Sequence, residues 1–131
     1  MLPSMNFGAV ELATSQPHYD YNFRLADDSD SDRFTTQLTG LTYVLDVNGK
    51  PTVGAITVEH QDALGIKMMV SIDRCKGHGR RMTIELGLAR RLGKHFLCAE
   101  NLDSDTEPIW IRLGFNMRQV QDDVIVRCKR I

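Results

Sequence analysis

The first clear pattern along the chain is that of extended strands joined by tight turns. LTYVLDV (residues 41–47) is rich in β-branched and aromatic residues, and Asn48-Gly49 after it is the dipeptide most typical of a two-residue hairpin turn. PTVGAITVEH (51–60) continues as the return strand, and LGIKMMVSI (64–72) follows a short polar break as a third. The pattern predicts an antiparallel meander.

The period of the apolar residues then changes from two to that of a helix. RRMTIELGLARRLGKH (80–95) places Met82, Leu86 and Ala89 on one face, which predicts an amphipathic helix. FLCAE (96–100) has the length and composition of a short buried strand. A strand, a helix and a strand of these lengths predict a parallel βαβ crossover.

The last part of the chain predicts one more helix and one more hairpin. EPIWIRLG (107–114) has Pro108 in its first turn and Gly114 at its end, as short helices often do. FNMRQVQDDVIVRCKR (115–130) predicts two strands that turn at Asp122-Asp123. The predicted fold is therefore mixed α+β, with a mixed central sheet, in a single domain of 131 residues.

The first forty residues show the least periodicity. Within them, the acidic and serine-rich stretch ADDSDSDRF (26–34) is a good cap for a helix through RFTTQL (33–38). Asp28, Asp30 and Asp32 have the spacing of a calcium loop, but the glycine and the final glutamate of such a loop are missing. We interpret the stretch as a solvated cap or loop, and we predict no metal site.

Composition narrows the classes of function. The net charge of −1 gives no overall attraction to nucleic acid or an anionic membrane, and no apolar run approaches the ~20 residues that span a bilayer. Cys75, Cys98 and Cys128 are odd in number and far apart, which favours free thiols in a reducing compartment. Because the N-terminus is also a poor signal peptide, we expect a cytoplasmic protein.

A basic, glycine-containing turn, RCKGHGRR (74–81), joins the third strand to the long helix. A helix start carries unpaired N–H groups and partial positive charge, and glycines allow a ligand close to the backbone. Lys76, Arg80 and Arg81 are unfavourable at this helix end unless an anion binds there. The turn therefore predicts a phosphate or diphosphate site, the alternative being an ordinary glycine turn with solvated charges. It has neither the Walker nor the dinucleotide-binding glycine pattern.

Two motifs together carry a resemblance to a known family. RCKGHG (74–79) resembles the Gln/Arg-x-x-Gly-x-Gly/Ala signature of the GNAT superfamily of acyl-CoA N-acyltransferases. WIRLGF (110–115) is similar to the aromatic-x-x-x-Gly-Phe pattern that ends the short helix of that family. The resemblance extends over residues 41–131, roughly, and the order of the predicted elements agrees with it.

This resemblance implies that acetyl-CoA is the cofactor. The diphosphate is implied to bind main-chain N–H groups of the turn, in the stretch that Arg74 opens and that contains Cys75, Lys76, Gly77, His78, Gly79 and Arg80. The preceding strand is implied to pair with the pantetheine arm through Met69, Val70 and Ser71. A bulge N–H there, at Val70 or a residue beside it, is implied to face the thioester carbonyl. Asn101 resembles an asparagine that the family often has after the next strand.

Amine acylation also needs a general base. Glu59 and His60 lie where the family often places a carboxylate, and adjacent strand residues face opposite ways, so we prefer Glu59. Trp110 stands where the family usually has a tyrosine as general acid. Because indole is no useful proton donor, we expect Trp110 to pack in the core.

The prediction is an N-acetyltransferase that moves an acetyl group from acetyl-CoA to a primary amine, either of a protein or of a small cation. The family's first strand and paired helices, which normally shape the acceptor pocket, are not recognisable in the short region 1–40, so the resemblance implies no particular amine as acceptor. The acidic stretch 27–32 would favour a cation. The alternative is a non-catalytic acyl-CoA-binding regulatory or interaction module, and a phosphate- or nucleic-acid-binding domain is a distant third. We expect no nucleic acid or membrane partner, and a monomer or a homodimer.

Overall fold

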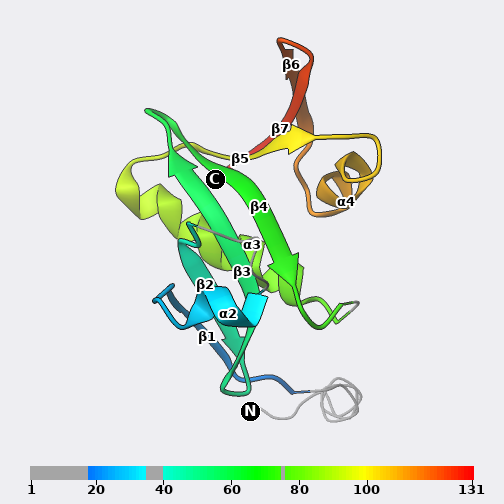
Figure 1. Cartoon of the computed structure of the whole chain (residues 1–131). Helices are drawn as coiled ribbons and strands as arrows, with labels where there is room; N and C mark the ends of the chain where they lie inside the picture. The colour runs from blue at the N-terminus through cyan, green and yellow to red at the C-terminus, as the bar shows by residue number, and fades with distance from the viewer. Residues whose placement is uncertain (1–17, 35–39, 75) are drawn as a thin grey trace, which may run out of the picture.

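The computed structural model describes residues 18–34, 40–74 and 76–131. Their seven strands form one sheet in the order β1-β2-β3-β4-β5-β7-β6 (Figure 1). All neighbouring strands are antiparallel except β4 and β5, which are parallel. The strands are β1 Tyr21–Leu25, β2 Tyr43–Val47, β3 Lys50–Glu59, β4 Ala63–Ser71, β5 Phe96–Leu102, β6 Met117–Gln121 and β7 Val124–Arg130. The predicted mixed α+β fold is therefore confirmed.

Both predicted hairpin turns are present, and each has the backbone that its residues favour. Asn48 and Gly49 have φ values of 52° and 81°, and Asp122 and Asp123 have values of 51° and 66°. Two consecutive positive φ angles match the right-handed twist of the flanking strands. Strand β1, which pairs with β2 from Tyr21↔Val47 to Leu25↔Tyr43, was not predicted.

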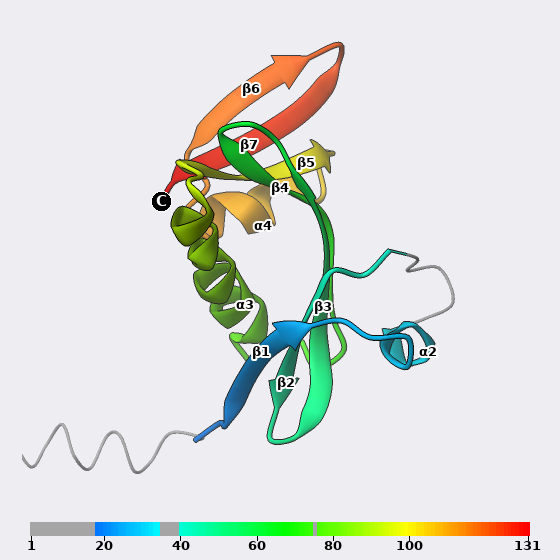
Figure 2. The ribbon, with the colours of Figure 1, turned by 90° about the vertical axis from the view of Figure 1, so that its left-hand side faces the viewer.

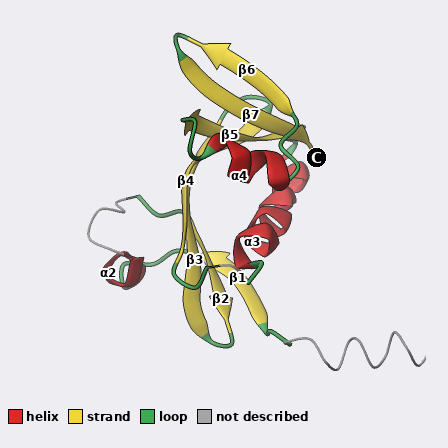
Figure 3. Ribbon diagram, turned by 90° about the vertical axis from the view of Figure 1, so that its right-hand side faces the viewer, coloured by secondary structure: helices red, strands yellow, loops and turns green. Residues whose placement is uncertain are grey.

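Helices cover the two faces of the sheet unequally. Figures 2 and 3 show α3 (His78–Leu86) and α4 (Glu107–Arg112) on one face and α2 (Asp30–Phe34) on the other. The predicted helix 80–95 begins two residues earlier and narrows at Gly87 into the 3₁₀ segment Gly87–Leu92. Glycine is a poor residue for a helix interior, and short 3₁₀ turns are common at helix ends.

The core lies between the sheet and α3. It contains Leu64, Ile66, Met82, Leu86 and Leu97, all of them almost completely buried. Trp110 belongs to this core, as predicted, and its ring lies edge-on to Phe115 with 5.0 Å between centroids. A smaller cluster of Phe34 and Val44 lies on the α2 side of the sheet.

Strands β4 and β5 pair over only four positions. Their register runs from Ala63↔Phe96 to Ile66↔Ala99, and beyond this point the two strands separate, which leaves one edge of β4 without a strand partner. A register shift between β3 and β4 inserts Lys67 as an extra residue at the same place. We call this point, where β4 and β5 separate, the fork.

Cys98 and Cys128 are joined by a disulfide, so the prediction of free thiols is wrong for these two residues. They are direct partners in the register of β5 and β7, with 4.0 Å between their Cα atoms. Thirty positions separate them in the sequence, and spacing alone did not show that the fold makes them neighbours. Cys75 lies outside the described residues.

The described residues include no helix that is long and apolar enough to cross a membrane. That residues 1–131 form a single domain stays a prediction, because residues 1–17 lie outside the described part.

Candidate functional site

The predicted basic turn borders a cleft of about 630 Å³ on the helical face of the sheet, which we call the turn cleft. The unpaired end of β4 contributes Met69, Val70 and Ser71. The turn and the first residues of α3 contribute Arg74, Gly77, Gly79 and Arg80, and α4 closes the cleft with Thr106, Ile109, Arg112 and Leu113. The structure thus brings together seven of the predicted cofactor-binding residues.

The start of α3 has main-chain N–H groups that lack a helical partner beside this cleft. Gly77 precedes the helix with a φ of 81°, and no side chain caps the helix start. The first bond of the helix runs from the Arg81 N–H to the Gly77 carbonyl, so the N–H groups of residues 78–80 have no helical partner. These donors and the helix dipole favour an anion.

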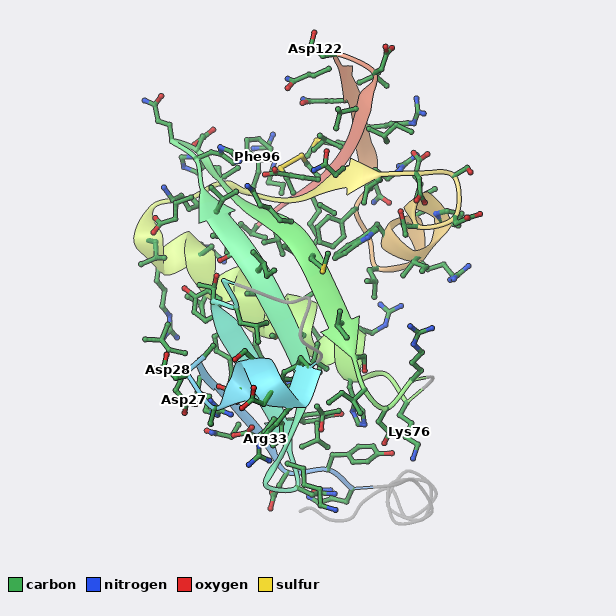
Figure 4. The ribbon with its side chains drawn as sticks, in the orientation of Figure 1. Asp27, Asp28, Arg33, Lys76, Phe96 and Asp122 are labelled. Carbon is green, nitrogen blue, oxygen red and sulfur yellow. A yellow bond between two sulfur atoms is a disulfide. The ribbon has the colours of Figure 1, made fainter. Side chains whose placement is uncertain are left out.

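Arginine side chains strengthen the positive character of the turn cleft. Arg74 and Arg112 form no ion pair with any described residue, although both line the cleft. Arg80 donates a hydrogen bond to the main-chain oxygen of Arg112 at 2.9 Å, which ties α3 to α4. Lys76 does not line the cleft; it pairs with Asp73 at 3.3 Å and lies at the outer end of the turn (Figure 4).

The free edge of β4 favours a residue beside Val70, and not Val70 itself, as the donor to the thioester carbonyl. The Ile72 N–H donates to the Thr52 oxygen at 2.9 Å, and hydrogen-bonded and non-bonded pairs alternate along an antiparallel ladder. Val70, two residues earlier, therefore directs its N–H toward Gly54 in β3. Met69 and Ser71 direct theirs to the unpaired edge, so Met69 replaces Val70 as the candidate donor to the thioester carbonyl.

The side chain of His78 is turned away from the turn cleft. Its imidazole is 1% exposed and does not line the turn cleft. The Nδ1 atom is hydrogen-bonded to the hydroxyl of Tyr21 at 3.0 Å, and the Tyr19 ring lies edge-on at 4.7 Å between centroids. Burial raises the pKa of Tyr21. Only the main chain of His78 remains available to a ligand in the turn cleft.

A second cleft, of about 470 Å³, lies against the opposite face of the sheet, and we call it the hairpin cleft. Cys98, Glu100 and Cys128 belong to its wall, and so does His60 from the turn before β4. The β6–β7 hairpin adds polar groups, ending in Asp122, which Figure 4 shows at the hairpin tip. Asn101 lines this cleft and not the turn cleft. It lies in the register shift between β5 and β7 and has a φ of 57°.

Glu100 is the carboxylate that the structure places at the fork. It follows Ala99, the last β5 residue paired with β4, and its side chain is 19% exposed. Its Oε2 accepts a hydrogen bond from Nε2 of His60 at 2.7 Å. One sequence signal could have identified Glu100, namely the alternation of side chains along FLCAE. Cys98 and Glu100 share one face of this strand, and Leu97 and Ala99 share the other.

Glu59, the predicted base, lines neither of these two clefts. Its side chain is 65% exposed and pairs with Lys94 at 3.5 Å between the charged atoms. The acidic stretch 27–32 also lies outside both clefts: Asp30 is buried under Arg24, whose hydrogen bonds lower the pKa of that carboxyl. Within the described residues, no three His, Cys, Asp or Glu side chains are grouped as a metal site would require.

No protein-family model and no curated protein sequence matches the chain. Several solved structures, however, match the fold of the chain. An alanine N-acetyltransferase for a ribosomal protein from Escherichia coli matches with a TM-score of 0.64 and 18% identity, over 86% of this chain and 94% of that one. An acetyltransferase of the GNAT family from Listeria monocytogenes matches with a TM-score of 0.61 and 10% identity, over 85% of this chain and 95% of that one.

A third structure, of a Salmonella typhimurium protein with its cofactor acetyl-CoA, matches with a TM-score of 0.59 and 20% identity, over 84% of this chain and 93% of that one. These likenesses show that the chain has the fold of the GNAT acyl-CoA N-acyltransferases. The fold that the resemblance implied is thereby confirmed.

Proposed function

We propose that this protein is an acetyl-CoA-dependent N-acetyltransferase that binds its cofactor in the turn cleft. One observation carries the proposal: uncapped N–H groups of α3, arginine side chains and the unpaired edge of β4 all border the same cleft. A ligand that suits it has an anionic end and a long arm able to pair with a strand, as an acyl-CoA does.

The residues present fit the two parts of coenzyme A. The N–H groups of residues 78–80 suit the diphosphate, together with the side chains of Arg74 and Arg112. Lys76 contributes only through its main chain, and the same role for Cys75 remains a prediction. Main-chain groups of Met69 and Ser71 suit the pantetheine amides and direct the arm toward the fork. Bound acetyl-CoA would supply an activated acetyl thioester there.

The hairpin cleft supports an amine as the acceptor. Glu100 and Asp122 place carboxylates in its wall, and Gln119 and Gln121 add amides, a combination that complements an ammonium group. The acidic stretch 27–32 does not belong to this wall, because it lies outside both clefts. Because the cleft is open, it suits a lysine or N-terminus of a protein as well as a small cationic amine.

Two further expectations remain predictions. A monomer or a homodimer is expected, without nucleic acid or membrane partners. A cytoplasmic location also stays a prediction, and the Cys98–Cys128 disulfide removes two of the three free thiols that favoured it.

The described lining of the turn cleft contains no tyrosine that could protonate the leaving thiolate. A thiol of ordinary pKa, about 8.5, is a tolerable leaving group without one. The same observation favours the alternative function, a module that binds acyl-CoA without turnover.

The test is to mix the purified protein with acetyl-CoA and a panel of primary amines, and to measure both cofactor binding by calorimetry and release of free thiol. Binding with amine-dependent thiol release supports the proposal, whereas binding without release supports the regulatory module. Arg112→Gln should weaken cofactor binding about tenfold, because a charge-assisted hydrogen bond contributes about 1.5–3 kcal/mol. Arg91→Gln, an exposed arginine outside the turn cleft, is the matched control and should bind normally. Absence of any binding would overturn both functions.

A further inference from the structure

Glu100 is held at the fork by two neighbours that act on its carboxylate from different sides. Gly65, across the parallel pair β4–β5, leaves room for it: a Cβ at position 65 would overlap Oε2 and would also come within 3.0 Å of Val58. His60 donates its hydrogen bond to the same oxygen from the β3–β4 turn. The hydrogen bond from His60 and the space left by Gly65 therefore favour this position of the carboxylate.

The position of Glu100 relates it to both clefts. The side chain of Glu100 faces the hairpin cleft, while the preceding residue, Ala99, faces the core on the helical face of the sheet. Beyond Ala99 the two strands no longer pair. At the fork, therefore, no hydrogen-bonded strand pair separates the two faces of the sheet. An arm that runs along the free edge of β4 from the turn toward the fork ends near Glu100.

We propose that Glu100 is the general base that deprotonates the acceptor amine, and that His60 and Gly65 position it. The inference rests on the proposed function. Of the other carboxylates nearby, Glu59 is turned to solvent and paired with Lys94, and Asp122 lies at the tip of the hairpin. Neither is at the fork.

The ammonium group gives one proton to the Glu100 carboxylate, which passes it to water through the open hairpin cleft. The amine lone pair then forms the C–N bond at the thioester carbon. The C–S bond breaks with its electron pair on sulfur, and the second nitrogen proton completes the thiol. An amide, a free thiol and one released proton result.

The first experiment compares Glu100→Gln with Glu59→Gln in thiol-release kinetics at neutral pH. Glu100→Gln should lower kcat/KM for the amine by a factor of about 10² or more, which is the usual contribution of a general base. Its dissociation constant for coenzyme A should stay within twofold of wild type, because the residue does not line the turn cleft. Glu59→Gln should keep wild-type kinetics.

A pH profile separates a base from a merely structural residue. Among the described residues, the titratable side chains that line the hairpin cleft together with Glu100 are His60 and Asp122, and Lys94 contacts the His60 main-chain oxygen. The acidic limb of kcat/KM against pH should disappear in Glu100→Gln, and it should move in His60→Gln while coenzyme A binding is retained. Gly65→Ala should lower kcat/KM, whereas Gly87→Ala, whose new Cβ meets nothing within 4 Å, should not.

The outcomes distinguish failure of Glu100 as the general base from failure of the proposed function. Should wild type turn over while Glu100→Gln keeps half of its kcat/KM, this inference fails and the proposed function stands. Should wild type acetylate no amine, the proposed function fails and takes the inference with it. Thermal unfolding verifies the fold of each variant; if Glu100→Gln proves unfolded, an unchanged pH profile in folded His60→Gln overturns the proposal.

Discussion

The guanidinium of Arg24 binds the carboxylate of Asp30 in a bidentate manner, with Nη1 donating to Oδ2 at 2.9 Å and Nη2 donating to Oδ1 at 2.8 Å. The same guanidinium donates to Asp46 through Nε at 2.8 Å. Arg24 lies in β1, Asp46 in β2 and Asp30 at the start of α2. The three side chains therefore attach α2 to β1 and β2, on the side of the sheet that has only the smaller apolar cluster of Phe34 and Val44.

Asp30→Asn should destabilise the protein by about 2 kcal/mol, since removing one partner of a largely buried ion pair leaves the other charge uncompensated. The side chain of Asp30 is 1% exposed, although Arg24 retains 26% exposure and its second partner, which moderates the effect. Chemical denaturation with urea measures the difference. Asp28→Asn changes an exposed residue of the same acidic stretch and should stay within 0.5 kcal/mol of wild type.

The same network predicts a dependence of stability on pH. Hydrogen bonds from Arg24 lower the pKa values of Asp30 and Asp46 from the ordinary 3.8, and the same bonds raise the pKa of Arg24. Carboxyls with lowered pKa values stabilise the fold fully above their unfolded pKa and lose that contribution as pH falls through the folded values. Thermal unfolding should therefore show a decrease below about pH 4 that is smaller in Asp30→Asn. An equal decrease in both proteins would contradict the assignment.

Reduction of the Cys98–Cys128 disulfide should lower the free energy of unfolding by about 3 kcal/mol, because the bond closes a 30-residue loop that contains α4 and β6. Thermal unfolding with and without a dithiol reductant measures the effect. The double variant Cys98→Ser/Cys128→Ser should unfold like the reduced wild type and should not respond to the reductant. A response in the double variant would point to Cys75 instead.

Local patterns were sufficient to predict most of the fold. The meander, the crossover and the final hairpin follow from runs of apolar residues and from turn residues with positive φ, all of which are properties of neighbours in the sequence. Strand β1 was missed because the serine- and aspartate-rich stretch after it obscured the alternation of Tyr21, Phe23 and Leu25. A five-residue strand gives a weak signal unless its partner is known.

The candidate site was predictable only where one segment of chain forms it. The glycine turn and the end of β4 are such segments, and their residues do share a cleft. Glu100 and His60 are 40 residues apart and meet only because β4 and β5 are neighbours in the sheet. The sequence also left the donor on β4 open between Val70 and the residues beside it. The phase of an antiparallel ladder depends on which residue pairs are hydrogen-bonded, and in this sheet the bond between Thr52 and Ile72 fixes it.

The two glycines of the basic turn should respond differently to alanine. Gly77 has a φ of 81°, a region that costs an L-residue roughly 1–2 kcal/mol, whereas Gly79 has no positive φ and a Cβ there would meet only the methyl group of Met69, at 3.9 Å. Gly77→Ala should therefore lower stability by about 1 kcal/mol and weaken coenzyme A binding about tenfold, because the turn must change shape where it presents its N–H groups.

Gly79→Ala serves as the matched control and should remain within 0.5 kcal/mol of wild type in urea denaturation. Calorimetry with coenzyme A then separates two causes. If Gly77→Ala is destabilised and yet binds coenzyme A with wild-type affinity, the turn is strained for structural reasons alone and the diphosphate binds elsewhere. Weakened binding in Gly77→Ala with a smaller effect in Gly79→Ala would instead locate the anion at the start of α3, where the N–H groups of residues 78–80 have no helical partner.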